Sequence, residues 1–348
     1  MKLIHAADLH LGSPLSSISD DAKRTIRKNE ILKSFEALVN YAKENDVKII
    51  MLSGDVFDSD SPYKKDKDYF YRLIEKNKDI KFLYLKGNHD ISGKFEEEYE
   101  NLLKFDDTWK TYKFGDLCIT GVELNNANSK AIYPSLSLDK KKTNIVMMHG
   151  DVYSKGNNYI SLKDLKDKGI DYLALGHIHE NSIDKLDERG YYAYSGCLEG
   201  RGYDETGEKG FYLLNYDNGK IDAEFIKTSI RLIHQVDIDI TNLTSFVLVK
   251  EKIEDKLKDI NKEDIVRVNL VGDNQTSEDL DELKYYFSFF DFTVKDMSKR
   301  KINYLDYEND LSLKGEFVRG VLNNDKYSED EKNEIIYLGL KALKGGMR

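Results

Sequence analysis

The sequence predicts an α/β protein that continues into a small α+β domain and ends in a helical tail. Short apolar runs alternate with helical segments over the first two thirds of the chain, which is the pattern of a sheet flanked by helices. A shorter strand–helix alternation follows, and apolar residues at helical spacing fill the end of the chain. The 348 residues suffice for one large core and one smaller core. We therefore expect domains at residues 1–228 and 229–305 and a tail at residues 306–348.

The large domain is expected to contain strands and helices in alternation. Residues 21–46 are predicted to be helical because Ile31, Phe35 and Leu38 recur at intervals of three or four residues. Further helices are expected at residues 64–78 and 161–169. The expected strands cover residues 2–8, 47–55, 80–90, 116–124, 144–151 and 171–179. Residues 191–196, 209–217 and 220–228 look like an antiparallel set that closes the domain.

The small domain is expected to be a β-α-β-α-β unit, because its predicted strands and helices alternate over a shorter stretch. Residues 231–240 alternate like a half-buried strand, and Phe246, Val249 and Ile253 then share one face of a helix. The unit continues with a strand, a second helix and a last strand, at residues 264–272, 277–290 and 291–298.

The tail is predicted to form two helices, at residues 311–324 and 328–346. Ser328 and Glu331 make the capping-box pattern that starts a helix. The two helices carry more apolar residues than a helical pair can bury on itself, which predicts a docking surface for a partner. Packing against the small domain is the alternative interpretation.

Composition limits the protein class. The formal net charge of −10 argues against a chain that coats nucleic acid with its whole surface, although a local basic groove remains compatible with it. Cys118 and Cys197 have no paired spacing, as in a reduced cytoplasmic protein. The start of the chain meets charge too soon for a signal peptide. No stretch approaches the roughly 20 apolar residues of a membrane span, so a cytoplasmic protein without a membrane partner is expected.

Polar residues collect where the expected strands end. The motifs are AADLH (Asp8, His10), LSGDVFD (Asp55, Asp58), LKGNHD (Asn88, His89, Asp90), MMHGD (His149, Asp151) and LGHIH (His177, His179). Alone, DLH, GD and GNHD are commonly turns or helix caps, His149 is typical of a half-buried packing histidine, and GHIH is the strongest single indication of ligands. Together the motifs hold five of the seven histidines. Ligands bind outside the carboxyl ends of the strands in open α/β sheets, so the set predicts one ligand-binding rim. His5 and His234 lie inside strand patterns and are expected to be structural.

The donors in these motifs are carboxylate, amide and imidazole groups, without a thiolate. Such a set suits Mn²⁺, Fe²⁺ or Zn²⁺, and an octahedral version favours Mn²⁺. The donors are too many for one ion, whereas two ions roughly 3.5–4 Å apart would use them all, with one carboxylate between them. A pair of this kind activates water and stabilises both oxygens of an in-line phosphoryl displacement.

In this order the motifs DLH, GDVFD, GNHD, HGD and GHIH resemble those of the calcineurin-like metallophosphoesterase family. Residues 1–228 resemble its DNA-repair branch, the SbcD nucleases, through HAADLHLGSP and LSGDVFDSDSP. YLALGHIHE and YSGCLEGRGYDETGEKGFYLL resemble a YhaO-like subgroup, and GEFVRGVL and LGLKAL extend a weaker likeness into the tail. The resemblance implies a β-sandwich of two mixed sheets flanked by helices, with a capping domain and a helical tail.

The resemblance also implies a role for each motif residue. One ion would be held by Asp8, His10 and His179, the other by Asn88, His149 and His177, and Asp55 would bridge them. His89 would stabilise the phosphate or protonate the leaving oxygen, with Asp90 orienting it. Asp58 would lie behind the ligands. The implied cofactors are two divalent ions, most readily Mn²⁺, with Fe²⁺, Zn²⁺ and Mg²⁺ as alternatives.

The implied function is that of a Mn²⁺-dependent DNA exonuclease and endonuclease in DNA repair, working with an SbcC-like coiled-coil ATPase. Candidate contacts to DNA phosphates are Arg24, Arg27, Lys28, Arg201, Lys299, Arg300 and Lys301. Each of these is individually more typical of a solvated surface. Two alternatives stay open: a phosphodiesterase or phosphatase for a small molecule or nucleotide, and a non-catalytic assembly module. A homodimer is also left open.

Overall fold

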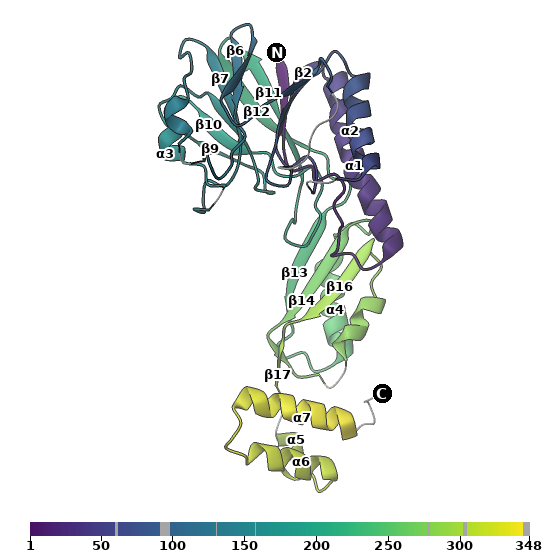
Figure 1. Ribbon diagram of the computed structural model, residues 1–348. Coiled ribbons are helices and arrows are strands. Elements are labelled where there is room, and N and C mark those ends of the chain that lie inside the picture. The colour runs from purple at the N-terminus through teal and green to yellow at the C-terminus, as the bar shows by residue number, and fades with distance from the viewer. Residues whose placement is uncertain are drawn as a thin grey trace. The chain divides into compact units, whose positions relative to one another are not determined.

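The computed structural model describes residues 1–59, 62–90, 98–129, 131–156, 158–276, 279–301 and 305–343 (Figure 1). The chain forms two compact units, Met1–Ile233 and His234–Arg348. No helix within the described ranges is both long and apolar enough to cross a lipid bilayer.

The first sheet of the first unit has six strands in the order β12-β11-β1-β2-β3-β4. Strands β1 to β4 run parallel, and β11 and β12 extend the sheet in antiparallel fashion beside β1. The strands are β1 (Lys2–Ala6), β2 (Val47–Ser53), β3 (Lys81–Leu85), β4 (Leu102–Lys104), β11 (Gly210–Asp217) and β12 (Lys220–Lys227). Apolar runs such as VKIIMLS form the central strands because those strands are covered on both faces.

The second sheet also has six strands, in the order β5-β6-β7-β8-β10-β9. They are β5 (Lys110–Phe114), β6 (Leu117–Gly121), β7 (Thr143–His149), β8 (Tyr172–Gly176), β9 (Ser182–Lys185) and β10 (Tyr191–Tyr194). Strands β6, β7, β8 and β10 are parallel, with antiparallel strands at both edges. The expected closing set is thus wrong in one respect: β10 pairs with β8 and β9 in this sheet, whereas β11 and β12 belong to the other.

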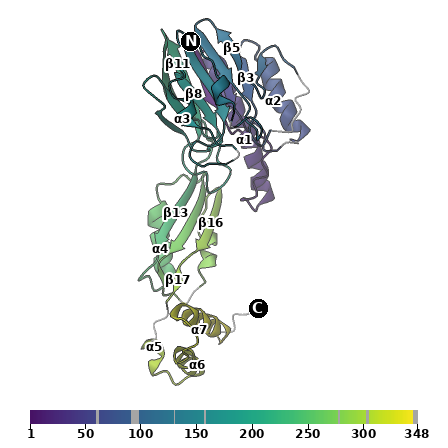
Figure 2. The same ribbon diagram turned by 60° about the vertical axis from the view of Figure 1, so that its left-hand side comes forward.

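The two sheets pack face to face through a shared apolar core. Leu3, Met51 and Leu83 of the first sheet cluster with Ile119 and Met147 of the second, and all five side chains are buried. The outer face of the first sheet is covered by α1 (Asp21–Glu44) and α2 (Lys64–Lys76), as Figure 2 shows. The predicted α/β class, with two mixed sheets flanked by helices, is confirmed.

Short helices cover the outer face of the second sheet. The 3-10 helix η1 (Tyr133–Ser135) and helix α3 (Leu162–Leu165) lie over it, and Tyr133 and Leu165 are buried against its strands. Helix α3 is shorter than the expected segment at 161–169. Its cap, Ser161, accepts the backbone N–H of Asp164.

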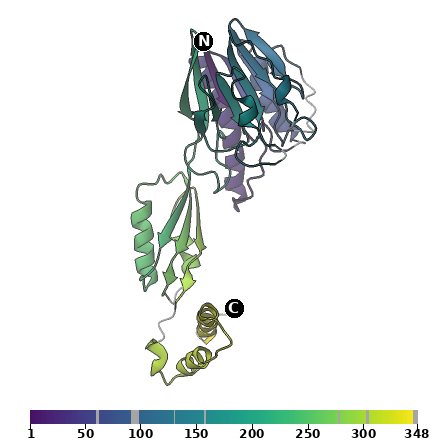
Figure 3. The ribbon, with the colours of Figure 1, turned by 90° about the vertical axis from the view of Figure 1, so that its left-hand side faces the viewer.

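The second unit is built on a three-stranded sheet in the order β13-β14-β16, which α4 covers on one face (Figure 3). The elements are β13 (Ile233–Asp239), α4 (Phe246–Leu257), β14 (Ile265–Val271) and β16 (Asp291–Asp296), with a small ladder of β15 (Asp273–Asn274) and β17 (Lys299–Arg300). The helix expected at 277–290 is wrong. Within the described residues 279–290, only Leu280–Tyr285 is helical, as the 3-10 helix η2, and the expected positions 277 and 278 lie outside the described residues. The buried residues of η2, Leu280 and Leu283, are three positions apart, a spacing that suits a 3-10 turn.

The second unit ends in α5 (Leu305–Glu308), α6 (Leu313–Leu322) and α7 (Glu329–Leu343). The predicted capping box is confirmed, since the Ser328 N–H donates to Glu331 at 2.8 Å and the Glu331 N–H donates to the Ser328 hydroxyl at 3.4 Å. Helices α6 and α7 pack on each other, and Val318 and Ile336 are fully buried. Leu313 and Leu338 stay exposed, at 67% and 47%.

Candidate metal centre

The predicted ligands lie at the carboxyl ends of five strands, three in the first sheet and two in the second. Asp8 and His10 follow β1, Asp55 follows β2, Asn88 follows β3, His149 ends β7, and His177 and His179 follow β8. The face-to-face packing of the sheets brings these ends to one rim. The backbone N–H of His177 donates to both carboxylate oxygens of Asp8 at 3.0 Å, which ties one sheet to the other.

Four of these residues have a left-handed backbone. The φ angles of Asp8, His10, Asp55 and His177 are 52°, 45°, 50° and 104°. Residues other than glycine rarely adopt this region, at a cost of about 1–3 kcal/mol each. Such strain persists where the surrounding structure enforces it, and it gathers at functional sites. The rim is therefore shaped to aim side chains inward at the expense of local stability.

Two glycines allow the rim to close. A Cβ atom on Gly54, whose φ is +95°, would lie 2.2 Å from Nδ1 of His149. A Cβ atom on Gly87 would lie 2.1 Å from a carboxylate oxygen of Asp55. The side chains of His149 and Asp55 thus occupy the space that a side chain at position 54 or 87 would need, so both positions require glycine.

The first half-site consists of Asp8, His10 and His179. Each offers a ligand atom, and these atoms lie within 4.8 Å of one another. The Nε2 atoms of His10 and His179 are 3.2 Å apart. Asp8 and His10 are completely buried, so the half-site is shielded from solvent on the side of the sheets.

The second half-site consists of Asn88, His149 and His177. The Asn88 Oδ1 atom lies 3.1 Å from Nε2 of His149 and 3.0 Å from Nδ1 of His177. Asp55 stands between the half-sites, because its Oδ2 atom is 3.4 Å from Nε2 of His149 and 3.9 Å from Nε2 of His10. The structure therefore brings together all seven residues that the resemblance implied as ligands.

The histidines are oriented by groups behind them. The Nδ1 atom of His10 lies 3.0 Å from Asp58, and that of His179 lies 2.8 Å from Glu205. The Nδ1 atom of His149 lies 2.9 Å from the carbonyl oxygen of Ser53. An acceptor at Nδ1 favours the Nδ1–H tautomer and leaves the Nε2 lone pair facing the centre. Asp58 thus lies behind a ligand, where the resemblance had placed it.

Burial and neighbouring charges shift the pKa values of the rim residues in different directions. Burial raises the pKa of Asp8 to about 7, and burial lowers the pKa of His10 to about 4. Burial alone would lower the pKa of His149, but the Asp55 and Asp8 carboxylates raise it to about 9. Burial alone would raise the pKa of Asp55, but His149 and His10 hold it well below its usual range. A proton on His149 therefore balances part of the buried negative charge.

The donor set fits two divalent cations. With Nδ1–H on His10 and His179, two Nε2 lone pairs face each other at 3.2 Å, an arrangement that a shared cation stabilises. The Asn88 oxygen and Nε2 of His149 also lie 3.1 Å apart, and a cation held by both would take the place of the His149 proton. Asp8 and Asp55 supply buried carboxylates with no cationic lysine or arginine within ion-pair distance among the described residues. Histidine nitrogen, carboxylate and amide oxygen together suit a borderline metal ion.

His89 lies at the exposed side of the rim, and its role differs from that of Asp90. The His89 ring packs edge-on against His10 with 5.1 Å between the ring centres, and its Nδ1 atom is 3.2 Å from the carbonyl oxygen of Asp58. The Asp90 carboxylate is buried and accepts the backbone N–H groups of Val56, Phe57 and Gly87. The prediction that Asp90 orients the His89 ring is therefore wrong, since Asp90 holds the loops that carry Asp55 and Asn88.

The candidate DNA contacts differ in position. Arg27 is fully buried and paired with Glu30 and Glu199, so its prediction as a DNA contact is wrong. Arg24 is bonded to the carbonyl oxygens of Ile18 and Ser19. Lys28 lies beside a small hollow. Arg201 belongs to the metal centre, where it pairs with Asp58 and Glu205.

The three basic residues at 299–301 lie in the second unit. The Arg300 guanidinium stacks on the Tyr337 ring, 3.7 Å from its centre, and is 3.7 Å from Asp296. Lys301 pairs with Asp273 at 3.0 Å while its side chain stays 61% exposed. Lys299 is exposed.

Glu205 is the functional residue that the sequence did not reveal. Its buried carboxylate contacts Nδ1 of His179 and the Arg201 guanidinium, and it accepts a hydrogen bond from the backbone N–H of Arg201. Burial alone would raise the pKa of Glu205, but His179 and Arg201 hold it well below its usual range. The available signal was its neighbourhood, because DETGEKG follows the LGHIH motif and carries the buried Lys209, which donates to the carbonyl oxygen of His179 at 3.1 Å.

The two remaining histidines lie outside the centre, as expected. His5 is fully buried in β1, with Nδ1 3.0 Å from the Tyr172 hydroxyl and Nε2 3.1 Å from the carbonyl oxygen of Leu175. His234 pairs with Asp264 at 2.8 Å in the second unit.

The chain is similar to known proteins over much of its length. A family described as calcineurin-like phosphoesterase matches residues 1–181. An uncharacterised metallophosphoesterase, YhaO of Bacillus subtilis, is 27% identical over 75% of this chain and 69% of its own length. The DNA double-strand break repair protein Mre11 of Saccharolobus solfataricus is 25% identical over 97% of this chain and 94% of its own length.

Solved structures are similar at a lower level. TT1561 of Thermus thermophilus superposes with a TM-score of 0.43 and 14% identity, over 64% of this chain and 98% of that one. A dimetal phosphatase of Danio rerio superposes with a TM-score of 0.42 and 10% identity, over 66% of this chain and 99% of that one.

The matched residues 1–181 contain both half-sites and Asp55, which lies between them, and they make up more than half of the chain. Two sheets whose strand ends converge on a site for two divalent ions agree with that match, and the chain is a member of the calcineurin-like phosphoesterase family, with a metal-dependent phosphoester hydrolase site.

Proposed function

We propose that the protein is a Mn²⁺-dependent phosphodiesterase that cleaves DNA, as an SbcD-like subunit of a repair complex. The observation that carries the proposal is the extent of its likeness to a DNA double-strand break repair protein. That likeness covers 97% of this chain, so it includes the second unit as well as the metal centre.

The residues of the rim have separable roles in such a reaction. Two divalent ions, when bound, supply Lewis acidity toward a phosphoryl group and activate water. The seven donors hold and space the ions. His89 stands exposed beside His10, where its ring reaches a phosphoryl or leaving oxygen, while the Asp58 carbonyl fixes its orientation. Asp90 keeps the loops in place through three backbone N–H groups.

Manganese is the proposed metal because imidazole contributes four of the seven donors, from His10, His149, His177 and His179. Mg²⁺ loses its water ligands reluctantly and prefers oxygen donors. Zn²⁺ and Fe²⁺ accept the same donors, so metal competition decides among them. We expect Mn²⁺ to restore more activity than Mg²⁺ after treatment with EDTA.

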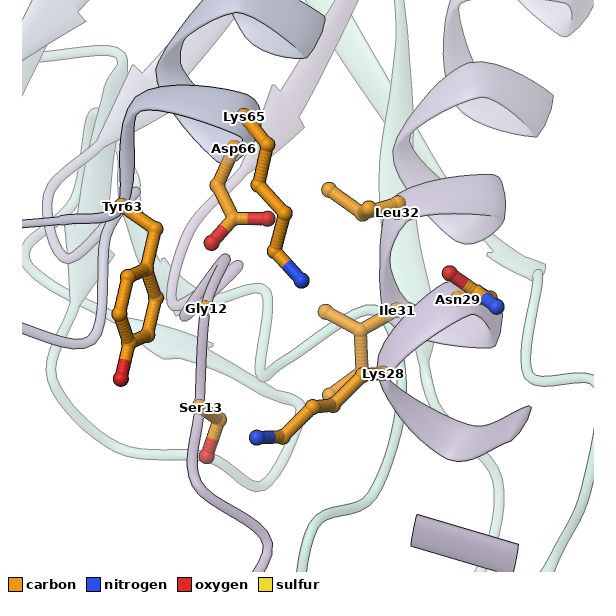
Figure 4. A pocket seen from close by; sticks show the side chains of 9 residues that line it. All are labelled: Gly12, Ser13, Lys28, Asn29, Ile31, Leu32, Tyr63, Lys65 and Asp66. Carbon is orange, nitrogen blue, oxygen red and sulfur yellow. The ribbon is translucent and has the colours of Figure 1, made fainter. Parts of the chain in front are cut away.

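Lysines near the rim are proposed to contact the DNA backbone. Figure 4 shows the ammonium groups of Lys28 and Lys65 at a hollow that Ser13 also lines, three residues after His10. The protein as a whole carries a net charge of −10, so DNA binding depends on such local groups and weakens as salt rises.

The proposed protein partner is an SbcC-like coiled-coil ATPase, bound by α6 and α7. Helices α6 and α7 pack on each other, and Val318 and Ile336 are buried, but Leu313 and Leu338 stay exposed. An apolar helical face of this kind commonly lies in the groove of a partner. The Leu313→Glu and Leu338→Glu changes together should abolish co-purification with the co-expressed ATPase. Ile183→Glu, at a residue 43% exposed in β9, is the matched control, and persistent co-purification of the double variant would contradict the docking proposal.

The catalytic proposal is tested by nicking of supercoiled plasmid and by hydrolysis of bis-p-nitrophenyl phosphate, each with Mn²⁺. We expect both activities in the wild type and neither in EDTA. His89→Asn should lose the cleavage of DNA while it keeps both metal ions, because His89 lies beside the donors. Hydrolysis of the small ester without DNA cleavage, at any salt concentration, would favour the small-molecule alternative instead.

A further inference from the structure

We propose that Arg201 is a positioning residue for the first half-site, because one guanidinium fixes both carboxylates that orient His10 and His179. The inference rests on the proposed two-metal function. It replaces the prediction that Arg201 contacts DNA.

The Arg201 guanidinium meets the carboxylate behind His10. Its Nη1 atom donates to Asp58 Oδ1 at 2.7 Å, and that same oxygen lies 3.0 Å from Nδ1 of His10. Asp58 cannot turn toward solvent without losing the arginine. The direction of the His10 ring is therefore coupled to the position of Arg201.

The same guanidinium meets the carboxylate behind His179. Its Nη2 atom donates to Glu205 Oε1 at 2.7 Å, and that oxygen lies 2.8 Å from Nδ1 of His179. The backbone N–H of Arg201 donates to the other oxygen of Glu205 at 2.7 Å. Both oxygens of Glu205 are thereby held by one residue, and Nη2 of Arg201 is itself 3.1 Å from Nδ1 of His179.

The backbone of Arg201 is itself anchored in two places. The Ser17 hydroxyl donates to its carbonyl oxygen at 3.0 Å, and the carbonyl oxygen of the preceding residue, Gly200, accepts from the buried Arg27 at 2.6 Å. Arg27 is in turn fixed by Glu30 and Glu199. The buried Arg27 thus supports the segment that carries Arg201.

The geometry explains why the residue is arginine and why it is not free for DNA. All three guanidinium nitrogens point at carboxylates, since Nε also lies 3.2 Å from Glu205. The side chain is only 16% exposed. A planar fork can pair with two carboxylates in fixed directions, whereas the point charge of a lysine cannot.

The second half-site is supported differently. Nδ1 of His149 faces the carbonyl oxygen of Ser53, a group of the main chain. Loss of Arg201 should therefore weaken one half-site and spare the other. A general loss of fold would affect both half-sites together, so the two outcomes are distinguishable.

The test is a titration of the full chain with Mn²⁺ by calorimetry, with stoichiometry checked by metal analysis. In Arg201→Gln one of two sites should weaken by about 10–100-fold, the usual effect of losing a group behind a metal-bound histidine. Arg201→Lys should recover part of the affinity at most, and Glu205→Gln should weaken the same single site. Arg189→Gln is the matched control, because Arg189 pairs with Asp171 elsewhere in the first unit.

Two unchanged affinities in Arg201→Gln and Arg201→Lys would overturn the inference. An equal loss at both sites, in the lysine variant and in Glu205→Gln alike, would also overturn it by showing a general effect. The wild type provides the separate check on the proposed function. Binding of a single ion by the wild type would contradict the two-metal function. In that case an unchanged affinity for the ion in Arg201→Gln would overturn the Arg201 inference too, whereas a reduced affinity would support it.

Discussion

The two halves of the metal centre are held by different chemistry. In the first half-site His10 and His179 are backed by Asp58 and Glu205, which share one arginine. In the second, His149 is backed by the main-chain carbonyl of Ser53, and His177 faces the amide of Asn88. One half depends on side chains of distant segments, and the other depends mostly on the strand ends themselves.

The two half-sites should therefore be sensitive to different changes. A carboxylate behind a histidine increases the basicity of the ring and fixes its tautomer. A main-chain carbonyl fixes the tautomer but adds no net charge. The metal affinity of the first half-site should therefore change on substitution of residues that are distant in sequence. The metal affinity of the second should depend on the protonation of its own ligands. Substitutions and proton counts at the rim can test that contrast.

The largest effect is expected where the halves meet. Asp55→Asn should remove both metal ions, because the carboxylate lies 3.4 Å from His149 and 3.9 Å from His10. DNA cleavage should fall by more than about 100-fold, the upper range for residues that only support a ligand. Metal analysis after gel filtration measures the first effect and plasmid nicking the second.

The control for this substitution is Asp46→Asn, at an exposed aspartate that pairs with Lys48 in the same unit. It should keep both ions and full cleavage. If Asp55→Asn retained one tightly bound ion, the carboxylate would belong to a single half-site and the bridging assignment would be wrong.

A smaller, one-sided loss is expected for Asn88→Ala. The Asn88 oxygen lies within 3.1 Å of both His149 and His177 but belongs to no contact of the first half-site among the described residues. Calorimetry with Mn²⁺ should show one site lost and the other unchanged. Loss of both sites would mean that the two halves are not independent, and the contrast between them would fail.

Proton release should also separate the halves. Between pH 7.5 and 8.5 the metal-free protein keeps a proton on His149, whose pKa is raised to about 9 by the Asp55 and Asp8 carboxylates against the effect of burial. His10, with a pKa of about 4, and Asp8, with a pKa of about 7, have already lost theirs. Filling the second half-site must expel the His149 proton.

The affinity of one site should therefore rise by about tenfold per pH unit in this window, while the affinity of the other stays flat. Calorimetry in two buffers of different ionisation enthalpy counts the protons released, and about one is expected for the second half-site. Equal proton release at both sites would contradict the assignment of the proton to His149.

The alternation of strands and helices was predictable, but the partners of the strands were not. Periodic apolar residues such as Phe35 and Leu38 mark a helix wherever it packs. Nothing local distinguishes β10, which joins the second sheet, from β11, which joins the first. The prediction of a second helix in the small unit was wrong for a related reason. Aromatic residues near Leu283 made the segment apolar, but they do not form one buried face of an α-helix.

The ligands were predictable because each one lies at or just after the carboxyl end of an apolar strand, and such ends meet at one rim. The supporting residues were not. Glu205 lies in a loop whose sequence is ordinary turn chemistry, and only the fold brings it to His179. Arg27 was wrongly predicted to contact DNA. Its charge alone does not reveal that Glu30 and Glu199 pair with it in the interior. Charged groups are placed by tertiary contacts, which the local pattern does not encode.

The smallest expected effect concerns His5, a histidine of the same sheet that binds no metal in this scheme. Burial lowers its pKa from 6.5 to about 3, so the native state keeps it neutral while the unfolded chain takes up a proton below pH 6.5. Its contribution to stability is complete above pH 6.5 and is lost progressively as pH falls toward 3.

Between pH 7.5 and 6.0 this group alone should reduce the free energy of unfolding by about 1 kcal/mol. His5→Gln should lower stability at pH 7.5, because the bonds to Tyr172 and Leu175 are disturbed, but its further loss on acidification should be smaller than that of the wild type by about the same amount. Urea unfolding in EDTA, followed by fluorescence of Trp109, is the measurement. The chain has a single tryptophan, which lies in the first unit, so the signal reports the unit that contains His5. Parallel pH dependences for the two proteins would show that His5 accepts a proton in the folded state. Its environment would then resemble the rim more than the core, and the distinction between metal-binding and structural histidines in this sheet would lose its physical basis.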